Sequence, residues 1–192
     1  MKKSKVLLLL TLIITFVTST FSVQAPQSGG FYYANAQSNV QLTNYWCWAA
    51  VAQDLASTHV SNYALQSDIV NHIKDFPDPT ANGTMNDIAN AATYLTGNQY
   101  YYFAHPGTVS KTQIMLLLSI NWAIGTYNFY ADDNTHPHAM LINYYDASDD
   151  TVFIFDPWKN SANQWVSLWN YINAGVKSGA DALPLKWKHS IY

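Results

Sequence analysis

The stretch Gln41-Leu-Thr-Asn-Tyr-Trp-Cys47-Trp-Ala-Ala50 holds the only cysteine among the 192 residues of the chain. Helix-forming residues follow the cysteine, and Val51 and Leu55 place an apolar stripe at helical spacing. The pattern predicts a helix that begins at Cys47 and fades between residues 57 and 61. A cysteine in the first helical turn lies near the positive end of the helix dipole, which lowers the thiol pKa and favours the nucleophilic thiolate.

A lone cysteine is also compatible with a purely structural role. Free cysteine is among the most buried residue types and then behaves as a small hydrophobic side chain. The catalytic interpretation of Cys47 therefore requires a base, a group that orients the base, and an oxyanion donor elsewhere in the chain.

The first half of the chain beyond Cys47 carries helical patterns. We expect three further helices, over residues 65–76, 85–95 and 111–120. Thr43 or Asn44 is expected to cap the Cys47 helix, and Thr84 and Ser110 the last two helices.

The second half of the chain changes to short runs of aromatic and aliphatic residues. These runs predict strands over residues 123–130, 138–145 and 151–155, then a helix over 163–174 and a final strand over 183–192. Helices first and strands afterwards predict an α+β fold, in which the Cys47 helix packs against an antiparallel sheet.

The N-terminus has the pattern of a secretory signal peptide over residues 1–25. Three lysines within the first five residues precede an apolar run that is too short to span a bilayer comfortably, and a cleavage signal ends at Ala25. A second cleavage candidate ends at Ala36. We expect a secreted protein without stable membrane insertion, with a flexible lead-in over residues 26–40 and one catalytic domain over residues 41–192.

Composition argues against several kinds of site. Without the three signal-peptide lysines, six lysines face twelve aspartates, so the formal charge is about −6 and nucleic acid is not an expected partner. The chain has no arginine and no glutamate, so every catalytic carboxylate must be an aspartate. His136 and His138 with Asp132 and Asp133 lack the spacing of a metal site. We expect neither a metal nor a cofactor.

His138 is the candidate base among the six histidines. Pro137 cannot donate a ladder hydrogen bond, so it should precede the strand and make His138 the first strand residue, with Met140 and Ile142 on its face. His136 would then lie outside the strand. His59, His72 and His189 lie in helical or terminal contexts that offer no partner, and His105 remains beside His136 and His138.

Asp156 is the candidate group that orients His138. A tight turn centred on Ala147 predicts three opposed pairs: Ile142 with Val152, Met140 with Ile154, and His138 with Asp156. Opposed Cβ atoms lie about 4.5 to 5.5 Å apart, so the carboxylate could accept a hydrogen bond from one ring nitrogen and fix the tautomer. A slip of one residue would put the two side chains on opposite faces.

Other interpretations of the aspartates remain at this point. Asp149 and Asp150 are rival carboxylates, but they fall in the hairpin loop, far along the strand from His138. Asp156 could also be an ordinary turn residue before Pro157. The apolar pairs of the register favour Asp156 as the partner of His138.

Four elements together resemble the bacterial papain-like cysteine peptidases, in particular the branch that includes bacteriocin-leader peptidases. They are Gln41, Cys47 in Tyr-Trp-Cys-Trp-Ala-Ala, His138-Ala139 at the start of a hydrophobic strand, and Asp156-Pro157-Trp158 after the next strand. The resemblance covers about residues 40 to 160. The family often has a glycine immediately before its histidine, where this chain has Pro137.

The resemblance implies a papain-like fold, with an N-terminal helical half, a C-terminal sheet half and a cleft between them. It implies that Cys47 is the nucleophile, that His138 is the base and that Asp156 orients the imidazole. It also implies an oxyanion hole formed by the Gln41 side-chain amide and the Cys47 backbone N–H. Gln41 precedes Cys47 by six residues, as the glutamine does in that family.

The expected function is that of a secreted cysteine peptidase, which hydrolyses a peptide or protein substrate through an acyl-enzyme on Cys47. One alternative is amidase or transglutaminase-like acyl transfer on the same triad. Another is a catalytically silent papain-like module that binds a peptide or a cell-surface partner. Such a module would keep the cleft but would lack a reactive thiol.

Overall fold

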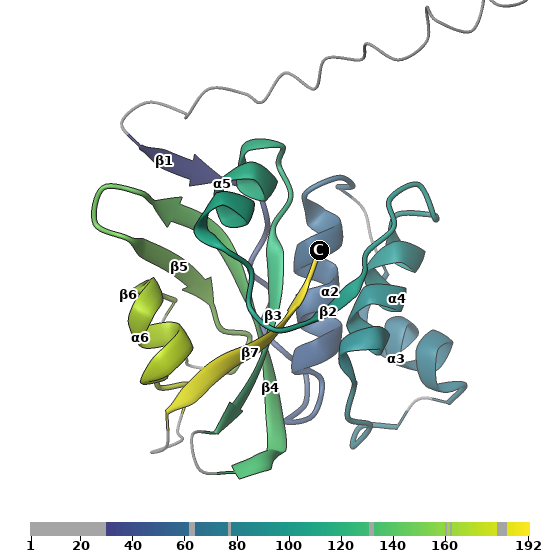
Figure 1. Cartoon of the computed structure of the whole chain (residues 1–192). Coiled ribbons are helices and arrows are strands. Elements are labelled where there is room, and N and C mark those ends of the chain that lie inside the picture. The colour runs from purple at the N-terminus through teal and green to yellow at the C-terminus, as the bar shows by residue number, and fades with distance from the viewer. Residues whose placement is uncertain are drawn as a thin grey trace, which may run out of the picture.

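The computed structural model describes residues 30–61, 64–76, 78–130, 133–159, 161, 163–179 and 184–192, without the side chains of residues 133–136. The helices between residues 47 and 119 precede the central strands of a large antiparallel sheet, as the sequence predicts (Figure 1). The signal peptide expected over residues 1–25 lies outside these ranges. No helix within them combines the length and the apolar content needed to cross a bilayer.

The helical half contains the four helices expected from the sequence. They are α2 (Cys47–Ser57), α3 (Gln66–Lys74), α4 (Met85–Leu95) and α5 (Lys111–Ser119). Thr84 and Ser110 cap α4 and α5 through capping boxes, as predicted. The expected cap of α2 is wrong, because Trp46 occupies the N-cap position and makes no side-chain cap bond. The Thr43 hydroxyl instead donates to the Pro79 carbonyl oxygen.

Within the described residues, the sheet half contains seven antiparallel strands. They are β1 (Phe31–Tyr33), β2 (Ala104–Pro106), β3 (Ile124–Tyr130), β4 (Asp133–Asp146), β5 (Thr151–Phe155), β6 (Gln164–Ser167) and β7 (Leu185–Ile191). The main path runs β2-β7-β3-β4-β5-β6, and β1 pairs with the far end of β4. The predicted strands therefore form one sheet with β4 near its centre.

Residues 31–34, expected as part of a flexible lead-in over residues 26–40, pair with the sheet. Phe31 pairs with Asp146 in the β1–β4 ladder, and the buried Ala34 donates its N–H to the Asn143 carbonyl oxygen at 2.9 Å. Sequence periodicity could not reveal this strand, because β1 is only three residues long.

The helix expected over residues 163–174 is only partly present. Residues 164–167 form β6, and only Leu168–Asn173 form a helix, α6. Trp165 pairs with Phe153 across the β5–β6 ladder, and their ring centroids lie 5.3 Å apart. Cross-strand aromatic packing of this kind stabilises a sheet, and it overrides the helical spacing of the sequence.

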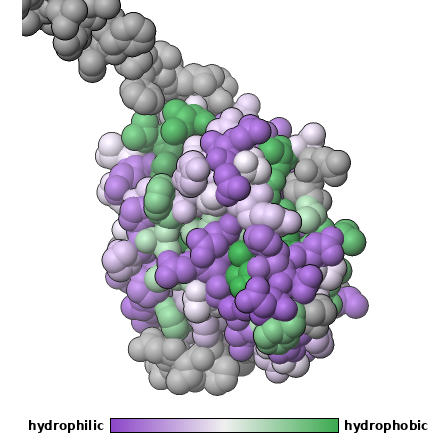
Figure 2. Space-filling model, turned by 90° about the vertical axis from the view of Figure 1, so that its right-hand side faces the viewer, coloured by the Kyte–Doolittle hydropathy of each residue, from purple (hydrophilic) through white to green (hydrophobic). Residues whose placement is uncertain are grey.

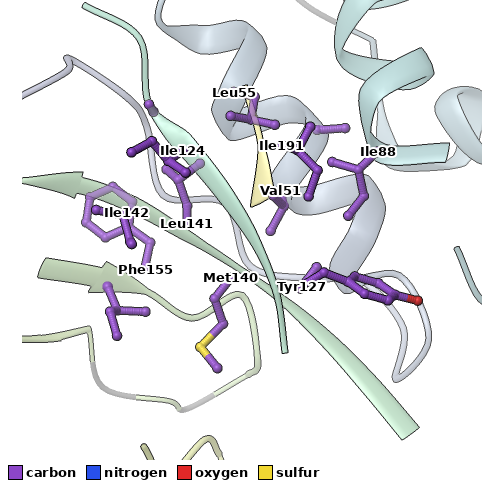
Figure 3. Packing of buried hydrophobic residues seen from close by; sticks show 14 of the residues in the cluster. Val51, Leu55, Ile88, Ile124, Tyr127, Met140, Leu141, Ile142, Phe155 and Ile191 are labelled. Carbon is purple, nitrogen blue, oxygen red and sulfur yellow. The ribbon is translucent and has the colours of Figure 1, made fainter. Parts of the chain in front are cut away.

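Helix α2 is the centre of the core. Its side chains from Trp48 to Ala56 are all buried, and Val51 and Leu55 point towards the sheet (Figure 3). Gly125 on β3 permits the close approach, because a Cβ at that position would lie 3.2 Å from Leu55 Cδ1 and 3.3 Å from Ile191 Cβ. The helix that carries Cys47 is thus packed closely against the sheet.

The outer helices shield α2 from solvent. The face of the molecule on the side of α3 and α4 is mainly hydrophilic, with hydrophobic residues in small separate patches (Figures 1 and 2). These helices turn apolar residues such as Ile69, Val70 and Ile88 inward, where they are fully buried. Cys47, at the N-terminal end of α2, is partly exposed, so this end of the helix can meet a ligand.

Candidate active site

Cys47 is the first residue of α2 and is partly exposed. Burial raises its pKa, but a hydrogen bond with the His138 side chain and the charge of that side chain outweigh burial, and the backbone N–H groups of Ala139 and Trp48 add to this effect. The net result is a lowered pKa of the Cys47 thiol. The residues predicted as nucleophile and base are therefore in contact, in surroundings that favour the thiolate.

His138 lies on β4 and is 8% exposed. Its Nε2 atom lies 2.7 Å from Asp156 Oδ1, which leaves Nδ1 as the ring nitrogen for Cys47. Burial lowers the pKa of His138, but the hydrogen bonds and charges of Asp156 and Cys47 raise it by more. The imidazolium form is thus held between a carboxylate and a thiolate.

Asp156 follows directly after β5 and is 5% exposed. Its Oδ1 atom also accepts from the Trp158 backbone N–H at 3.0 Å, and its Oδ2 atom accepts from Ser161 Oγ at 2.6 Å. Burial raises the pKa of Asp156, but the hydrogen bond with His138 and the charge of His138 lower it, and the hydroxyl groups of Ser161 and Ser178 lower it further. The net pKa is lowered, so the carboxylate stays ionised beside His138.

The contact between His138 and Asp156 is the one predicted, but the strand register behind it is different. Near the turn, Tyr145 pairs with Val152. Farther along, Ile142 pairs with Ile154, so Asn143 is an extra residue that forms a bulge in β4. The predicted pairs Ile142–Val152 and Met140–Ile154 are wrong.

The bulge explains why the contact exists despite the wrong register. The four residues between Asp146 and Thr151 form a longer loop than predicted, and a regular ladder from that loop would put His138 and Asp156 on opposite faces. The extra residue Asn143 returns them to one face. They then lie diagonally rather than directly opposite, within reach of their side chains.

Gln41 lies beside the first turn of α2 and is 6% exposed. Its Nε2 atom donates to the Thr43 carbonyl oxygen at 2.7 Å, and the Trp46 backbone N–H donates to the same oxygen at 3.3 Å. Its backbone N–H donates to the Pro157 carbonyl oxygen at 2.8 Å, next to Asp156. The predicted oxyanion donor therefore connects the start of the Cys47 helix to the loop that carries the carboxylate.

An open pocket of about 250 Å³ adjoins this connection. Its lining comes from the segment before α2 and from the loop after Asp156: Gln41, Leu42, Thr43, Asn44, Trp158 and Lys159. The Trp158 ring also meets the His138 ring edge to face, with centroids 6.2 Å apart. A ligand in this pocket would lie against both the Gln41 segment and the ring that covers His138.

Sequence reasoning missed a buried polar group behind His138. Asn128 Nδ2 donates to the His138 carbonyl oxygen at 3.0 Å, and the Tyr171 hydroxyl lies 2.6 Å from Thr126 Oγ1. It also missed Ser161, which binds Asp156. Only the strand pairing of Asn128 with His138 could have pointed to the first contact, and that pairing requires the β3–β4 register.

The other aspartates and histidines considered for the site have different partners. Asp150 forms an ion pair with Lys111, with 2.6 Å between Oδ2 and Nζ, while the His59 ring stacks on Tyr100. Among the residues that the structure describes, no three metal-binding side chains come together. The side chains of His136, Asp132 and Asp133 lie outside the described part.

Comparisons with known proteins support the fold. No family model matches the chain, and no curated protein matches its sequence. The solved peptidase domain of Streptococcus ComA, a bifunctional ABC transporter involved in a quorum-sensing pathway, is similar with a TM-score of 0.55 and 13% identity. The match covers 82% of this chain and 96% of that one.

A second solved structure gives the same result. A putative C39-like peptidase from Bacillus anthracis is similar with a TM-score of 0.51 and 13% identity, over 73% of this chain and 89% of that one. At this identity the likeness concerns the fold. The chain has an α+β fold like that of C39-type, papain-like peptidase domains, as the sequence resemblance implied.

Proposed function

We propose that the protein is a secreted cysteine peptidase that cleaves peptide bonds through an acyl-enzyme on Cys47. The observation that carries this proposal is the continuous series of contacts from Cys47 through His138 to Asp156. The lowered pKa of the thiol and the raised pKa of the imidazole both favour a thiolate–imidazolium pair.

The first half of the reaction forms the acyl-enzyme. The Cys47 thiolate attacks the carbonyl carbon, and the oxygen takes the negative charge of the tetrahedral intermediate. The Gln41 amide and the Cys47 backbone N–H, which the helix ladder leaves unused in the first turn, would donate to that oxygen. When the C–N bond breaks, the amine leaves with the proton from His138 Nδ1.

The second half of the reaction releases the acyl group. Neutral His138 accepts a proton from water, and the resulting hydroxide attacks the thioester carbon. The C–S bond then breaks, the product leaves as a carboxylic acid that loses its proton to solvent, and the thiolate–imidazolium pair returns. Asp156 stabilises the imidazolium in both halves and keeps Nε2 as a hydrogen-bond donor.

Two further features support parts of the proposal. The lysines and the apolar run within residues 1–25 support export of the chain, which mass spectrometry of the secreted protein would test by the mass of its N-terminal peptide. The open pocket beside Gln41 and Trp158 offers room for part of a peptide next to the expected oxyanion donor.

Thiol labelling is the test of the proposal. At pH 6 an ordinary cysteine is only about 0.3% thiolate, so iodoacetamide should alkylate Cys47 far faster than it alkylates free cysteine. Cys47→Ser should abolish labelling, and His138→Ala should slow it to the rate of free cysteine or below. Slow labelling that His138→Ala leaves unchanged would show that the thiolate–imidazolium pair does not exist.

A peptide library then tests the reaction that follows. Incubation with and without an added primary amine, followed by mass spectrometry, separates hydrolysis from acyl transfer to the amine. We expect hydrolysed products in both incubations. Slow labelling together with no cleavage would instead support the silent binding module.

A further inference from the structure

We propose that Gln66, the first residue of α3, is a positioning residue that holds the backbone on both sides of Gln41 and thereby fixes the oxyanion donor. The inference rests on the proposed function, because it assigns a role within that reaction. Gln66 bonds to Val40, Leu42 and Gln53, so it would act on the reaction through Gln41.

The Gln66 amide binds the two peptide groups that flank Gln41. Gln66 Oε1 accepts from the Leu42 backbone N–H at 2.9 Å, and Gln66 Nε2 donates to the Val40 carbonyl oxygen at 3.0 Å. In extended backbone, the carbonyl before a residue and the N–H after it point to the same side. One side-chain amide therefore pairs with this segment as a neighbouring strand would.

The opposite side of the same residue is held by the loop of the carboxylate. The Gln41 backbone N–H points away from Gln66 and donates to the Pro157 carbonyl oxygen at 2.8 Å. Gln41 is thus fixed between Gln66 on one side and the residue after Asp156 on the other. With its backbone held, Gln41 can move only by changing its side-chain rotamer. The hydrogen bond from Gln41 Nε2 to the Thr43 carbonyl oxygen restricts that change.

A second buried amide holds Gln66 in place. Gln66 Nε2 donates its other hydrogen to Gln53 Oε1 at 3.0 Å, and Gln53 Nε2 donates to the Ala64 carbonyl oxygen at 2.7 Å. Both glutamines are buried, with 4% of Gln66 and 6% of Gln53 exposed. Both hydrogens on Gln66 Nε2 are used in these bonds. The Leu42 N–H can only donate, so it must face Gln66 Oε1, and the amide therefore has one possible orientation.

The arrangement connects the nucleophile helix to the oxyanion donor. Gln53 lies on α2, the helix that begins at Cys47, and Gln66 lies on α3. The contacts from Gln53 through Gln66 to the backbone around Gln41 therefore set the position of the Gln41 amide relative to Cys47 Sγ. Loss of one oxyanion donor lowers the rate about 10² to 10³-fold, and a displacement of about 1 Å can lower it about 10²-fold.

Two reactions of the same sulfur separate positioning of the donor from a general effect on the site. Iodoacetamide is attacked at a saturated carbon, so its reaction needs the thiolate but forms no oxyanion. p-Nitrophenyl acetate is attacked at a carbonyl carbon, so acylation of Cys47 passes through an oxyanion and releases p-nitrophenolate. The ratio of the acylation rate to the alkylation rate reports the oxyanion hole alone.

The central variant is Gln66→Met, which keeps the volume and removes the hydrogen bonds. We expect the acylation rate to fall by about 10 to 10²-fold while the alkylation rate stays within about twofold of the parent protein. In the background of Gln41→Ala, the same substitution should cause no further fall, because the donor that it positions is already gone. Equal falls in both rates, or an unchanged ratio, would overturn the proposal.

Two further variants complete the test. Ser57→Ala removes the bond between Ser57 Oγ and the Gln37 N–H, 2.8 Å long, which ties the same segment to α2 farther from Gln41. It should leave the ratio unchanged, and a fall equal to that of Gln66→Met would overturn a local role. If Gln66→Met does not fold, Gln53→Met decides: a ratio lowered by about threefold or more supports the proposal, and an unchanged ratio overturns it.

Failure of the proposed function has a different signature. A parent protein that is neither rapidly alkylated nor acylated has no activated thiolate, and the role of Gln66 falls with the function. A parent protein that reacts with both reagents, together with a Gln66→Met ratio equal to that of the parent, leaves the function standing and overturns the positioning role.

Discussion

His138 Nε2 lies 2.7 Å from Asp156 Oδ1, although the two residues are not directly opposed in the sheet. Asp156 sits beyond the last residue of β5, where the Trp158 backbone N–H fixes its Oδ1 atom from the other side. That N–H can only donate. The carboxylate is therefore oriented by a backbone group as well as by the imidazole.

Asp156→Asn should keep the tautomer of His138 and remove the charge beside it. The amide oxygen would take the Oδ1 position, because the Trp158 N–H requires an acceptor there, and the amide nitrogen would face Ser161 Oγ, a hydroxyl that can accept. Loss of the carboxylate charge lowers the pKa of His138. The basic limb of the pH profile of Cys47 acylation should therefore move to lower pH, and the maximal rate should fall by about 10² or more.

Ser161→Ala is the matched variant for this change. It removes the hydrogen bond to Asp156 Oδ2 but leaves the charge of the carboxylate in place. The basic limb should stay within about half a pH unit of the parent. A basic limb that does not move in Asp156→Asn would contradict the role of the carboxylate charge.

The elements with strong local signals were predictable from the sequence. Cys47 begins a helix, the caps Thr84 and Ser110 are in place, and the helix-to-strand order gives the α+β fold. The contact of His138 with Asp156 was also predicted. These features depend on helical spacing, on cap chemistry and on the alternation of β4, which are local properties of the chain.

The features that depend on pairing between distant segments were not predictable. The bulge at Asn143 has no sequence signal, and the predicted register was wrong by two residues, an even number that preserves the face. Strand β1 is too short to show a period. The contacts of Gln66 with Val40 and Leu42 join segments more than twenty residues apart, and no local pattern marks them.

Gly179→Ala should disturb the ring that covers His138. A Cβ at Gly179 would lie 2.1 Å from Trp158 Cδ1, and the left-handed φ of 51° adds backbone strain. The ring must move, and it meets His138 edge to face. We expect destabilisation of about 2 to 4 kcal/mol by denaturant unfolding, together with a slower acylation of Cys47.

Gly97→Ala separates the strain from the clash. Gly97 also has a left-handed φ, of 64°, but a Cβ there would meet nothing within 4 Å. It should lower the free energy of unfolding by only about 1 to 2 kcal/mol and leave acylation unchanged. Equal effects of the two substitutions would show that Trp158 does not depend on the space at Gly179.

Asp54→Asn should stabilise the protein, and more so as the pH rises. Asp54 lies on α2, 1% exposed, and burial raises its pKa well above the ordinary value against the opposing hydrogen bonds from Asn39. The folded state therefore binds a proton that the unfolded state releases above about pH 4, so stability is lost as the pH rises through that range. An asparagine oxygen can accept both Asn39 bonds without this penalty.

Asp87→Asn gives the opposite sign and serves as the comparison. Burial raises the pKa of Asp87, but the hydrogen bond with Lys74 and the bonds with Thr84 outweigh it and lower the pKa. This carboxylate stabilises the fold above the unfolded pKa of about 4 and loses that contribution as the pH falls further. Thermal unfolding at pH 4 and pH 7 should thus show a gain that grows with pH for Asp54→Asn and a loss that grows with pH for Asp87→Asn. A gain for Asp54→Asn that is the same at both pH values would show that the buried carboxyl has no raised pKa.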